Sequence, residues 1–306
     1  MHILADGFCY LEAPRWHQGA LWVSDFYQHA IFKISFDGQV EKIVDVPHQP
    51  SGLGWLADGR LLIVSMKDQK VLQYHQGVLS EYADLSHIAT GHCNDLITDA
   101  DGRAWVGNFS FDLMRGDDLA TAQLARIDPD GSVHVAATEL YFPNGMAIVN
   151  HQLLVNETFG NRISAFAIDQ DGNLGPRQDW VKFAELATGP ALDDYLAACR
   201  VAADGASVAD QEGAIWIADA LGQRGLRILD GKIVESISTA LLGCFACALG
   251  GETGNTLFLC VAPDFQEQQR AQHQQALIYT TSVAVPAAAL SSAHGLGRLW
   301  VICCAK

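Results

Sequence analysis

The sequence predicts an all-β protein, a six-bladed β-propeller that occupies the chain as one domain. Three observations lead to this prediction. The 306 residues are 49% hydrophobic and only 18% charged, so the chain can bury a large core. A unit of two apolar strands between turns occurs six times. The copies follow one another at intervals typical of propeller blades.

The repeated unit is a turn, an apolar strand, a short gap, a second strand and another turn. Its Asp-Gly and Glu-Gly pairs are typical of hairpin turns, because glycine tolerates positive φ. The runs between turns are rich in Val, Ile, Leu and aromatic residues, which favour strands. The copies are GALWVSDFYQHAIFKISFDG, DGRLLIVSMKDQKVLQYHQG, DGRAWVGNFSFDLM with LARIDPDG, NHQLLVNETFGNRISAFAIDQDG, EGAIWIADALGQRGLRILDG, and GNTLFLCVAPDF with ALIYTTSV.

The spacing of the copies indicates four-stranded blades. Successive equivalent positions lie 40, 43, 49, 62 and 42 residues apart, and a blade has about 40 to 50 residues. One blade cannot bury both faces, whereas six stacked around an axis can, so we assign residues 1–306 to one domain. The equivalent positions are Trp22, Leu62, Trp105, Leu154, Trp216 and Phe258.

Two segments depart from the repeat. The longest step contains GPALDDYLAACRVAADG, where Leu192, Tyr195, Leu196 and Cys199 recur at helical offsets. We expect an insertion near 186–202 that is helical, with an irregular loop as the alternative. The tail after about residue 286, which includes Cys303 and Cys304, is not assigned to a blade.

Charge and terminal sequence limit the partners. Nineteen Lys and Arg oppose 35 Asp and Glu, a formal net charge of −16, which disfavours nucleic acid and anionic membranes. The first residues lack a basic segment followed by a long apolar run, and apolar stretches such as 299–305 are too short to span a membrane. We therefore expect a cytoplasmic protein.

The eight cysteines follow no regular disulfide spacing, which suits a reducing compartment. Cys244 and Cys247 form the only CxxC. Without a second pair or a nearby histidine pair, a buried strand is favoured over a zinc site.

Polar residues occupy equivalent places ahead of five copies. In a propeller the innermost strands run side by side along the channel, so residues that open these strands should converge at one end. Carboxylates and carboxamides are hard oxygen ligands that suit Ca²⁺, Mg²⁺ or Mn²⁺ and also accept Zn²⁺. Each residue alone has a simpler interpretation, such as a turn or surface residue, but a structural role does not explain the repetition. The residues are Glu12, Ser51, Asn94, Asn144 and Asp204.

The sequence resembles the senescence marker protein 30, gluconolactonase and luciferin-regenerating enzyme family. The resemblance covers roughly residues 5–285 and is carried, in order, by LEAPRW, PSGLGWLADGRLLIVSM, HCNDLITDADGRAWVGNFSFDLM, FPNGMAI and the stretch from ADGAS to QEGAIWIAD. It implies a six-bladed propeller and a lactonase that hydrolyses cyclic esters such as sugar lactones. It also implies that Glu12, Asn144 and Asp204 bind one divalent metal ion, first of all Ca²⁺, and that Asn94 faces the substrate.

Near Asp204 the chain departs from the family pattern. Ala203 replaces a proline, and Asp204 lies six rather than five residues before Asp210. A one-residue shift would reverse the side chain unless a bulge absorbs it. We expect a bulge, because a carboxylate among apolar side chains costs several kcal/mol unless it is paired, and Gly205 relaxes the backbone.

The implied chemistry assigns Asp204, or a metal-bound water, as the base and Asn94 as a donor to the substrate. We further place Ser51, His92, Glu157 and Phe109 at the substrate. The alternatives are a hydrogen-bonded channel histidine for His92, a turn or surface role for Glu157 and a core position for Phe109.

Two other functions remain open at this point. One is a metal-independent enzyme of the strictosidine-synthase type, and the other is a non-catalytic propeller scaffold, because fold alone does not determine function.

Overall fold

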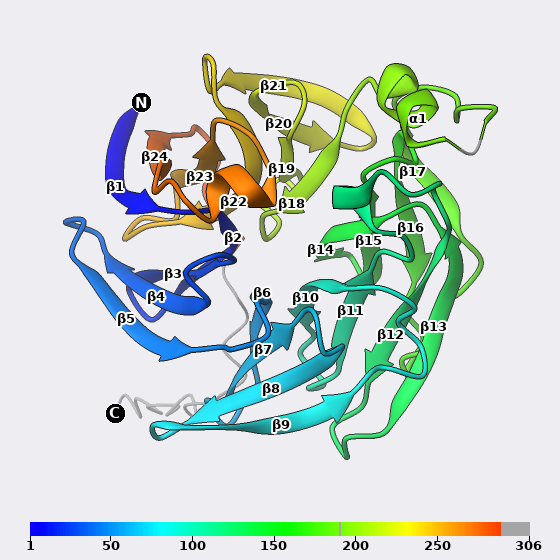
Figure 1. The fold of residues 1–306 in the computed structure, drawn as a ribbon, viewed down its shortest axis with the longest axis horizontal. Helices are drawn as coiled ribbons and strands as arrows, with labels where there is room; N and C mark the ends of the chain where they lie inside the picture. Colours follow the sequence, from blue (N-terminus) through cyan, green and yellow to red (C-terminus); the bar gives the residue numbers. More distant parts are fainter. Residues whose placement is uncertain (190, 289–306) are drawn as a thin grey trace, which may run out of the picture.

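The strands form six four-stranded antiparallel sheets around a central axis (Figure 1). The computed structural model describes residues 1–189 and 191–288, so Cys303 and Cys304, which were assigned no role, lie outside the described residues. The first strands of neighbouring sheets contact one another around the whole ring. The prediction of a six-bladed β-propeller is confirmed.

Blades 1 to 3 each follow chain order from the axis outward. Their strands are β2 (Leu11–His17), β3 (Ala20–Asp25), β4 (Ala30–Ser35), β5 (Val40–Asp45); β6 (Pro50–Trp55), β7 (Leu61–Ser65), β8 (Lys70–His75), β9 (Val78–Asp84); and β10 (Cys93–Thr98), β11 (Ala104–Asn108), β12 (Ala122–Ile127), β13 (Val133–Leu140).

Blades 4 and 5 repeat this order, whereas blade 6 is completed by the N-terminal strand. Their strands are β14 (Pro143–Val149), β15 (Gln152–Glu157), β16 (Arg162–Ala167), β17 (Gln178–Lys182); β18 (Ala203–Ala206), β19 (Ile215–Asp219), β20 (Arg224–Leu229), β21 (Lys232–Ser238); and β22 (Gly243–Gly250), β23 (Thr256–Ala262), β24 (Ala276–Ser282), β1 (His2–Phe8).

The pairing of β1 with β24 closes the ring. His2 lies opposite Thr280 and Phe8 opposite Ala276 in this antiparallel pair. The last blade therefore combines both ends of the propeller sequence, and the ring cannot open without separating these two strands. The sequence repeat did not reveal this strand, because β1 precedes the first copy of the repeated unit.

The equivalent positions chosen from sequence all fall in the second strand of a blade. Trp105, Trp216 and Phe258 are fully buried there, whereas Trp22 is only half-buried. The turns between first and second strands use glycine as predicted, with φ of +86° at Gly59. The large apolar residue that recurs in each copy of the repeat therefore packs between neighbouring blades.

Short helical segments lie outside the sheets. They are η1 (Leu113–Arg115), α1 (Leu192–Ala198) and α2 (Glu267–Arg270). The first α-helix lies within the insertion after blade 4, where Leu192 and Tyr195 pack against Phe111, Phe142 and Phe159. In the described part of the chain, no helix has the length and apolar character needed to cross a membrane.

Cys244 and Cys247 lie in β22 and are fully buried. Burial raises the pKa of the Cys247 thiol, and its Sγ donates to the carbonyl oxygen of Trp216 at 3.3 Å. Both thiols therefore serve as small core residues, as the strand interpretation of this CxxC predicted.

Candidate functional site

The five polar residues expected at the channel mouth occupy the same position in their blades. Each is the second residue of a first strand. In every blade the pairing of the first strand with the second shifts register at or just after this position. This irregularity turns the local side chains out of strict alternation. The five are Glu12, Ser51, Asn94, Asn144 and Asp204.

Glycine follows three of these residues for a steric reason. A Cβ on Gly145 would lie 2.4 Å from the backbone nitrogen of Ala206, and one on Gly52 would lie 2.2 Å from that of Leu96. These glycines allow adjacent first strands to approach closely along the channel. The Asn144-Gly145 pair, which resembles a turn in sequence, is therefore a strand contact.

The bulge expected at Asp204 is present, but it does not absorb the extra residue. The register shift between Ala203 and Ala206 matches those of the other blades. The extra residue is absorbed farther along, since Ser207 N–H donates to Trp216 O whereas Asp210 N–H donates to Ala214 O, which leaves one added residue between these two pairs. Beyond β18 the Ser207 hydroxyl accepts a hydrogen bond from the backbone N–H of Trp216 at 3.0 Å. Asp204 thus keeps its place in the pocket.

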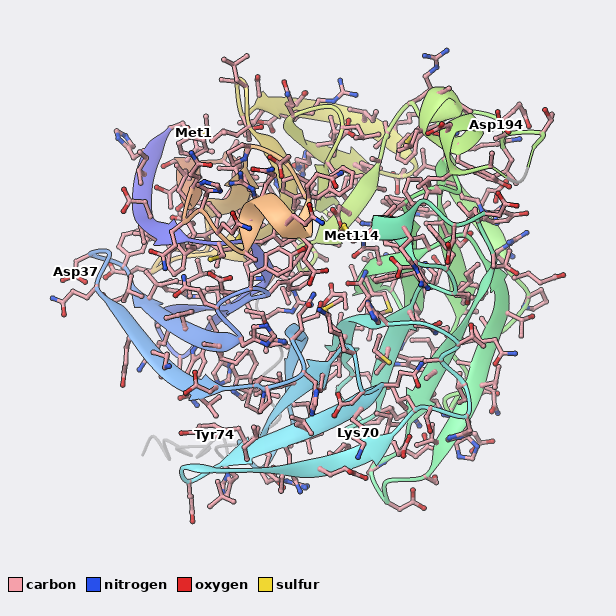
Figure 2. All side chains as sticks on the ribbon, viewed as in Figure 1. Met1, Asp37, Lys70, Tyr74, Met114 and Asp194 are labelled. Atoms are coloured by element: carbon pink, nitrogen blue, oxygen red, sulfur yellow. The ribbon has the colours of Figure 1, made fainter. Side chains whose placement is uncertain are left out.

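A pocket of about 360 Å³ opens at this end of the channel, within the range of small-molecule sites. Its floor contains Glu12, Asn94, Asn144 and Asp204, all less than 10% exposed. Met114 of η1 also lines it and lies near the centre of the ring in Figure 2. Asp210 instead pairs with Arg227 at 2.7 Å.

Asn144 connects blades 4 and 5 at the floor. Its amide nitrogen donates to the carboxylate of Asp204 and to the hydroxyl of Thr158, the latter at 3.1 Å. Thr158 donates in turn to the backbone oxygen of Ala203 at 2.8 Å. Among the described residues, none donates to Asn144 Oδ1, so this oxygen is available as a ligand.

Glu12 and Asp204 place two carboxyl groups in a buried environment. Burial raises the pKa of both well above the usual range, and the proximity of Asp204 raises that of Glu12 further. The backbone N–H of Ala13 donates to Glu12 at 3.3 Å. The nearby guanidinium of Arg15 is directed to Asp95 at 2.8 Å. In the part of the chain that the structure describes, no cationic side chain forms an ion pair with Glu12 or Asp204.

This donor set fits a divalent cation. Two carboxylates and a carboxamide oxygen are hard ligands, and a bound cation would offset the repulsion between buried negative charges. Within residues 1–189 and 191–288, no group of three or more His, Cys, Asp or Glu side chains is arranged for a metal ion. The residues expected to bind the metal would not form such a group, since the third of them is Asn144.

The residues expected at the substrate take different places. Ser51 donates to Asn94 Oδ1 at 3.3 Å and does not line the pocket. His92 lies directly before β10 and contacts Phe109 edge to face, with ring centroids 5.6 Å apart. His92 and Phe109 both line the pocket, and burial lowers the pKa of His92, which favours its neutral form.

Glu157 does not reach the pocket. Its side chain is fully buried and accepts hydrogen bonds from Arg162 at 2.8 and 3.0 Å, from Ser164 at 2.5 Å and from the backbone of Tyr141 at 2.8 Å. The expected substrate contact is therefore wrong. Glu157 is the last residue of β15, and its side chain points into the blade, where it forms an ion pair with Arg162.

A sequence profile of the SMP-30/Gluconolactonase/LRE-like region matches residues 11–263. The chain belongs to this family. The match begins at the first residue of β2 and ends just after β23, so it covers five whole blades and half of the sixth. No curated protein sequence matches the chain significantly.

Solved structures of this fold confirm the architecture. A gluconolactonase from Xanthomonas campestris is 22% identical, with a TM-score of 0.70 over 93% of this chain and 88% of that one. The calcium-binding protein regucalcin from Agrobacterium tumefaciens str. C58 is 18% identical, with a TM-score of 0.72 over 93% and 96%. A luciferin-regenerating enzyme is 17% identical, with a TM-score of 0.74 over 92% and 94%.

Two sets of residues line the pocket of this family member, and of these only His92 and Phe109 were predicted from sequence to lie at the substrate. One set lies directly before the first strands of blades 1 to 5, and the other directly after their second strands. Counting two residues back from each of the five polar strand-opening residues would have found the first set. The sets are Tyr10, Gln49, His92, Phe142 and Ala202, and Phe26, Met66, Phe109, Thr158 and Ala220.

Proposed function

We propose that the protein is a metal-dependent lactonase that hydrolyses a cyclic ester. The observation that carries this proposal is the pair of buried carboxyl groups, Glu12 and Asp204, beside the free amide oxygen of Asn144 at the floor of a pocket. Membership of the family and the fold shared with a gluconolactonase support it.

Glu12, Asn144 and Asp204 would hold one divalent ion, with Ca²⁺ the first candidate and Zn²⁺, Mn²⁺ or Mg²⁺ the others. Once bound, such an ion polarises an ester carbonyl and makes a neighbouring water more acidic. The donor atoms are hard oxygens, which all four ions accept.

The chain's own groups orient the ester and move the protons. Asp204 shares its carboxylate with the amide of Asn144, and this carboxylate accepts the proton of the attacking water. Ser51 holds Asn94 through its Oδ1 at 3.3 Å, which directs the amide N–H groups toward a ring oxygen or hydroxyl of the substrate. Neutral His92 at the wall can relay a proton to the leaving alkoxide.

The test is hydrolysis of a lactone panel by the purified protein after chelation and after add-back of each ion. We expect chelation to abolish turnover and one or more ions to restore it. Full activity in the chelated protein would favour the metal-independent enzyme. Absence of both turnover and metal binding by calorimetry would favour a scaffold.

Variants connect this activity to the proposed residues. Glu12→Gln and Asn144→Ala should each lower metal affinity and turnover by orders of magnitude. The matched control is Glu235→Gln on the exposed strand β21, which should retain both. Unchanged affinity and turnover in the first two variants would show that the assigned ligands are wrong.

A further inference from the structure

The walls of the pocket are apolar above a polar floor. On one side Phe109 stacks on Phe142 with centroids 4.6 Å apart, and Phe142 contacts Phe159 at 5.3 Å. On the other side Tyr10 lies 4.9 Å from Phe245. These aromatic contacts hold the rings in place and leave apolar surface facing the pocket.

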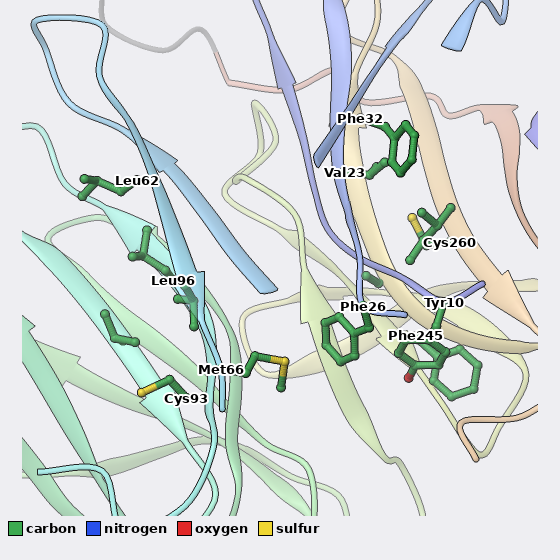
Figure 3. Close-up of a cluster of buried hydrophobic side chains, with 14 of the residues drawn as sticks. Tyr10, Val23, Phe26, Phe32, Leu62, Met66, Cys93, Leu96, Phe245 and Cys260 are labelled. Atoms are coloured by element: carbon green, nitrogen blue, oxygen red, sulfur yellow. The ribbon is translucent and has the colours of Figure 1, made fainter. Parts of the chain in front are cut away.

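Figure 3 shows how the second wall is built. Phe26, Tyr10 and Phe245 lie together, and Met66 projects toward them from blade 2. The Tyr10 and Phe26 rings are 5.2 Å apart. These residues come from three different blades, so the apolar wall is formed by the ring as a whole.

The polar side chains above the floor are partly engaged with other groups of the protein. They are Tyr10, Tyr27, Gln49, Lys67, His92, Asp112, Thr158 and Glu267. Lys67 is the one Lys or Arg among the described lining residues, and its ammonium lies 2.9 Å from Glu267. Gln49 donates its amide to the sulfur of Met66 at 3.3 Å. A substrate with many hydroxyls would lose hydrogen bonds to water against these walls, and partners that are already engaged would replace only part of them.

Blade 5 contributes small side chains to the pocket wall, at a place that we call the gap. Ala202 and Ala220 stand where blade 1 has Tyr10 and Phe26. The backbone N–H of Ala220 donates to the oxygen of Ala202 at 3.1 Å, so the two small residues are adjacent. Leu221 follows at the pocket wall with 46% of its surface exposed.

We propose that this site takes a lactone with an apolar chain rather than a polyhydroxylated sugar lactone. The lactone ring lies at the floor, and the chain runs past Ala202 and Ala220 toward Leu196 and Leu221. This inference rests on the proposed function for its hydrolytic readout. Burying each methylene of the chain should raise kcat/KM about fourfold until the gap is filled.

The experiment compares γ-lactones with 4-alkyl chains from methyl to heptyl with a polyhydroxylated δ-lactone, using metal-loaded protein. We expect kcat/KM to rise with chain length and to exceed that of the hydroxylated lactone. A flat series, or faster hydrolysis of the hydroxylated lactone, would overturn the inference.

Two variants address the path of the chain. Ala220→Leu fills the gap and should lower kcat/KM for the long-chain lactones more than for the methyl lactone, so that the gain with chain length is lost. Leu221→Asn makes the far wall polar and should reduce the gain at the longest chains. The control is Leu241→Asn, which changes a leucine that is 85% exposed and does not line the pocket. A chain-length series unchanged by both pocket variants contradicts the path.

Binding separates this inference from the proposed hydrolysis. Calorimetry with 4-alkyl γ-lactams, which resist hydrolysis, should give affinity that rises with chain length. If the lactams bind in this way and no lactone is hydrolysed, the apolar site stands and the lactonase proposal fails. If lactam affinity is independent of chain length, the apolar site is wrong even when lactones are hydrolysed.

Discussion

The fully buried carboxylate of Glu157 provides a quantitative test of how blade 4 is held together. Oε1 accepts hydrogen bonds from Arg162 and Ser164, and Oε2 accepts from Arg162 and the backbone of Tyr141. In Glu157→Gln, an amide NH₂ must replace one of these oxygens, so it faces two donors whichever way the amide is turned. The buried guanidinium of Arg162 also loses its compensating charge.

Breaking a buried ion pair on one side costs about 3–5 kcal/mol. For a large domain, 1 kcal/mol corresponds to roughly 2 °C in Tm. We therefore expect Glu157→Gln to lower the Tm of the metal-free protein by about 6–10 °C, measured by circular dichroism. The control, Glu185→Gln, removes the same charge from a side chain that is 86% exposed and paired with Lys182. It should change the unfolding free energy by less than about 0.5 kcal/mol.

The two outcomes assign Glu157 to different roles. A large loss of stability with metal affinity retained at low temperature supports the role inside the blade. If Glu157→Gln melts with the wild type and instead loses turnover, the carboxylate acts on the substrate and the structural reasoning is refuted.

Three further predictions concern other parts of the ring. Burial lowers the pKa of His17, so the unfolded chain binds a proton there more readily than the folded protein does. The free energy of unfolding should therefore fall as the pH drops below about 6.5. An NMR titration that gives His17 an ordinary pKa would contradict this. Gly145→Ala forces a Cβ to within 2.4 Å of the Ala206 nitrogen, which should cost about 1–3 kcal/mol in urea denaturation and weaken metal binding; unchanged stability would show that the strands can separate. Arg15→Met leaves the buried carboxylate of Asp95 unpaired and should lower the free energy of unfolding by about 3–5 kcal/mol. Adding Asp95→Asn to this variant should recover part of that loss. Equal stability of the single and double variants would mean that the two residues are not coupled.

The floor of the site was accessible from sequence because it repeats. Five equivalent strand openings carry oxygen-bearing side chains, and the structure brings four of them, Glu12, Asn94, Asn144 and Asp204, to one pocket. The fifth, Ser51, supports Asn94 from behind. Whether three of the four bind a metal ion stays a prediction, which the chelation and variant experiments address.

Glu157 shows the limit of that reasoning. Its position at the end of β15 gives no sign of whether its side chain turns toward the pocket or into the blade. Arg162 decides this, because it places a guanidinium inside the blade at the end of the neighbouring strand. That choice depends on strand pairing and burial, which a linear spacing does not contain.

The repeat in the sequence was enough to predict the six blades and their second strands, which recur in every copy, and the polar residues at the channel, which recur in five of the six blades. The folded structure was needed to see that β1 closes the ring on β24, that Gly52 and Gly145 serve strand contact, and which residues besides Phe109 form the apolar walls, with small side chains at blade 5. The physical reason is distance along the chain. Local patterns fix the strands, whereas the pocket surface is assembled from residues of separate blades that meet only when the ring closes.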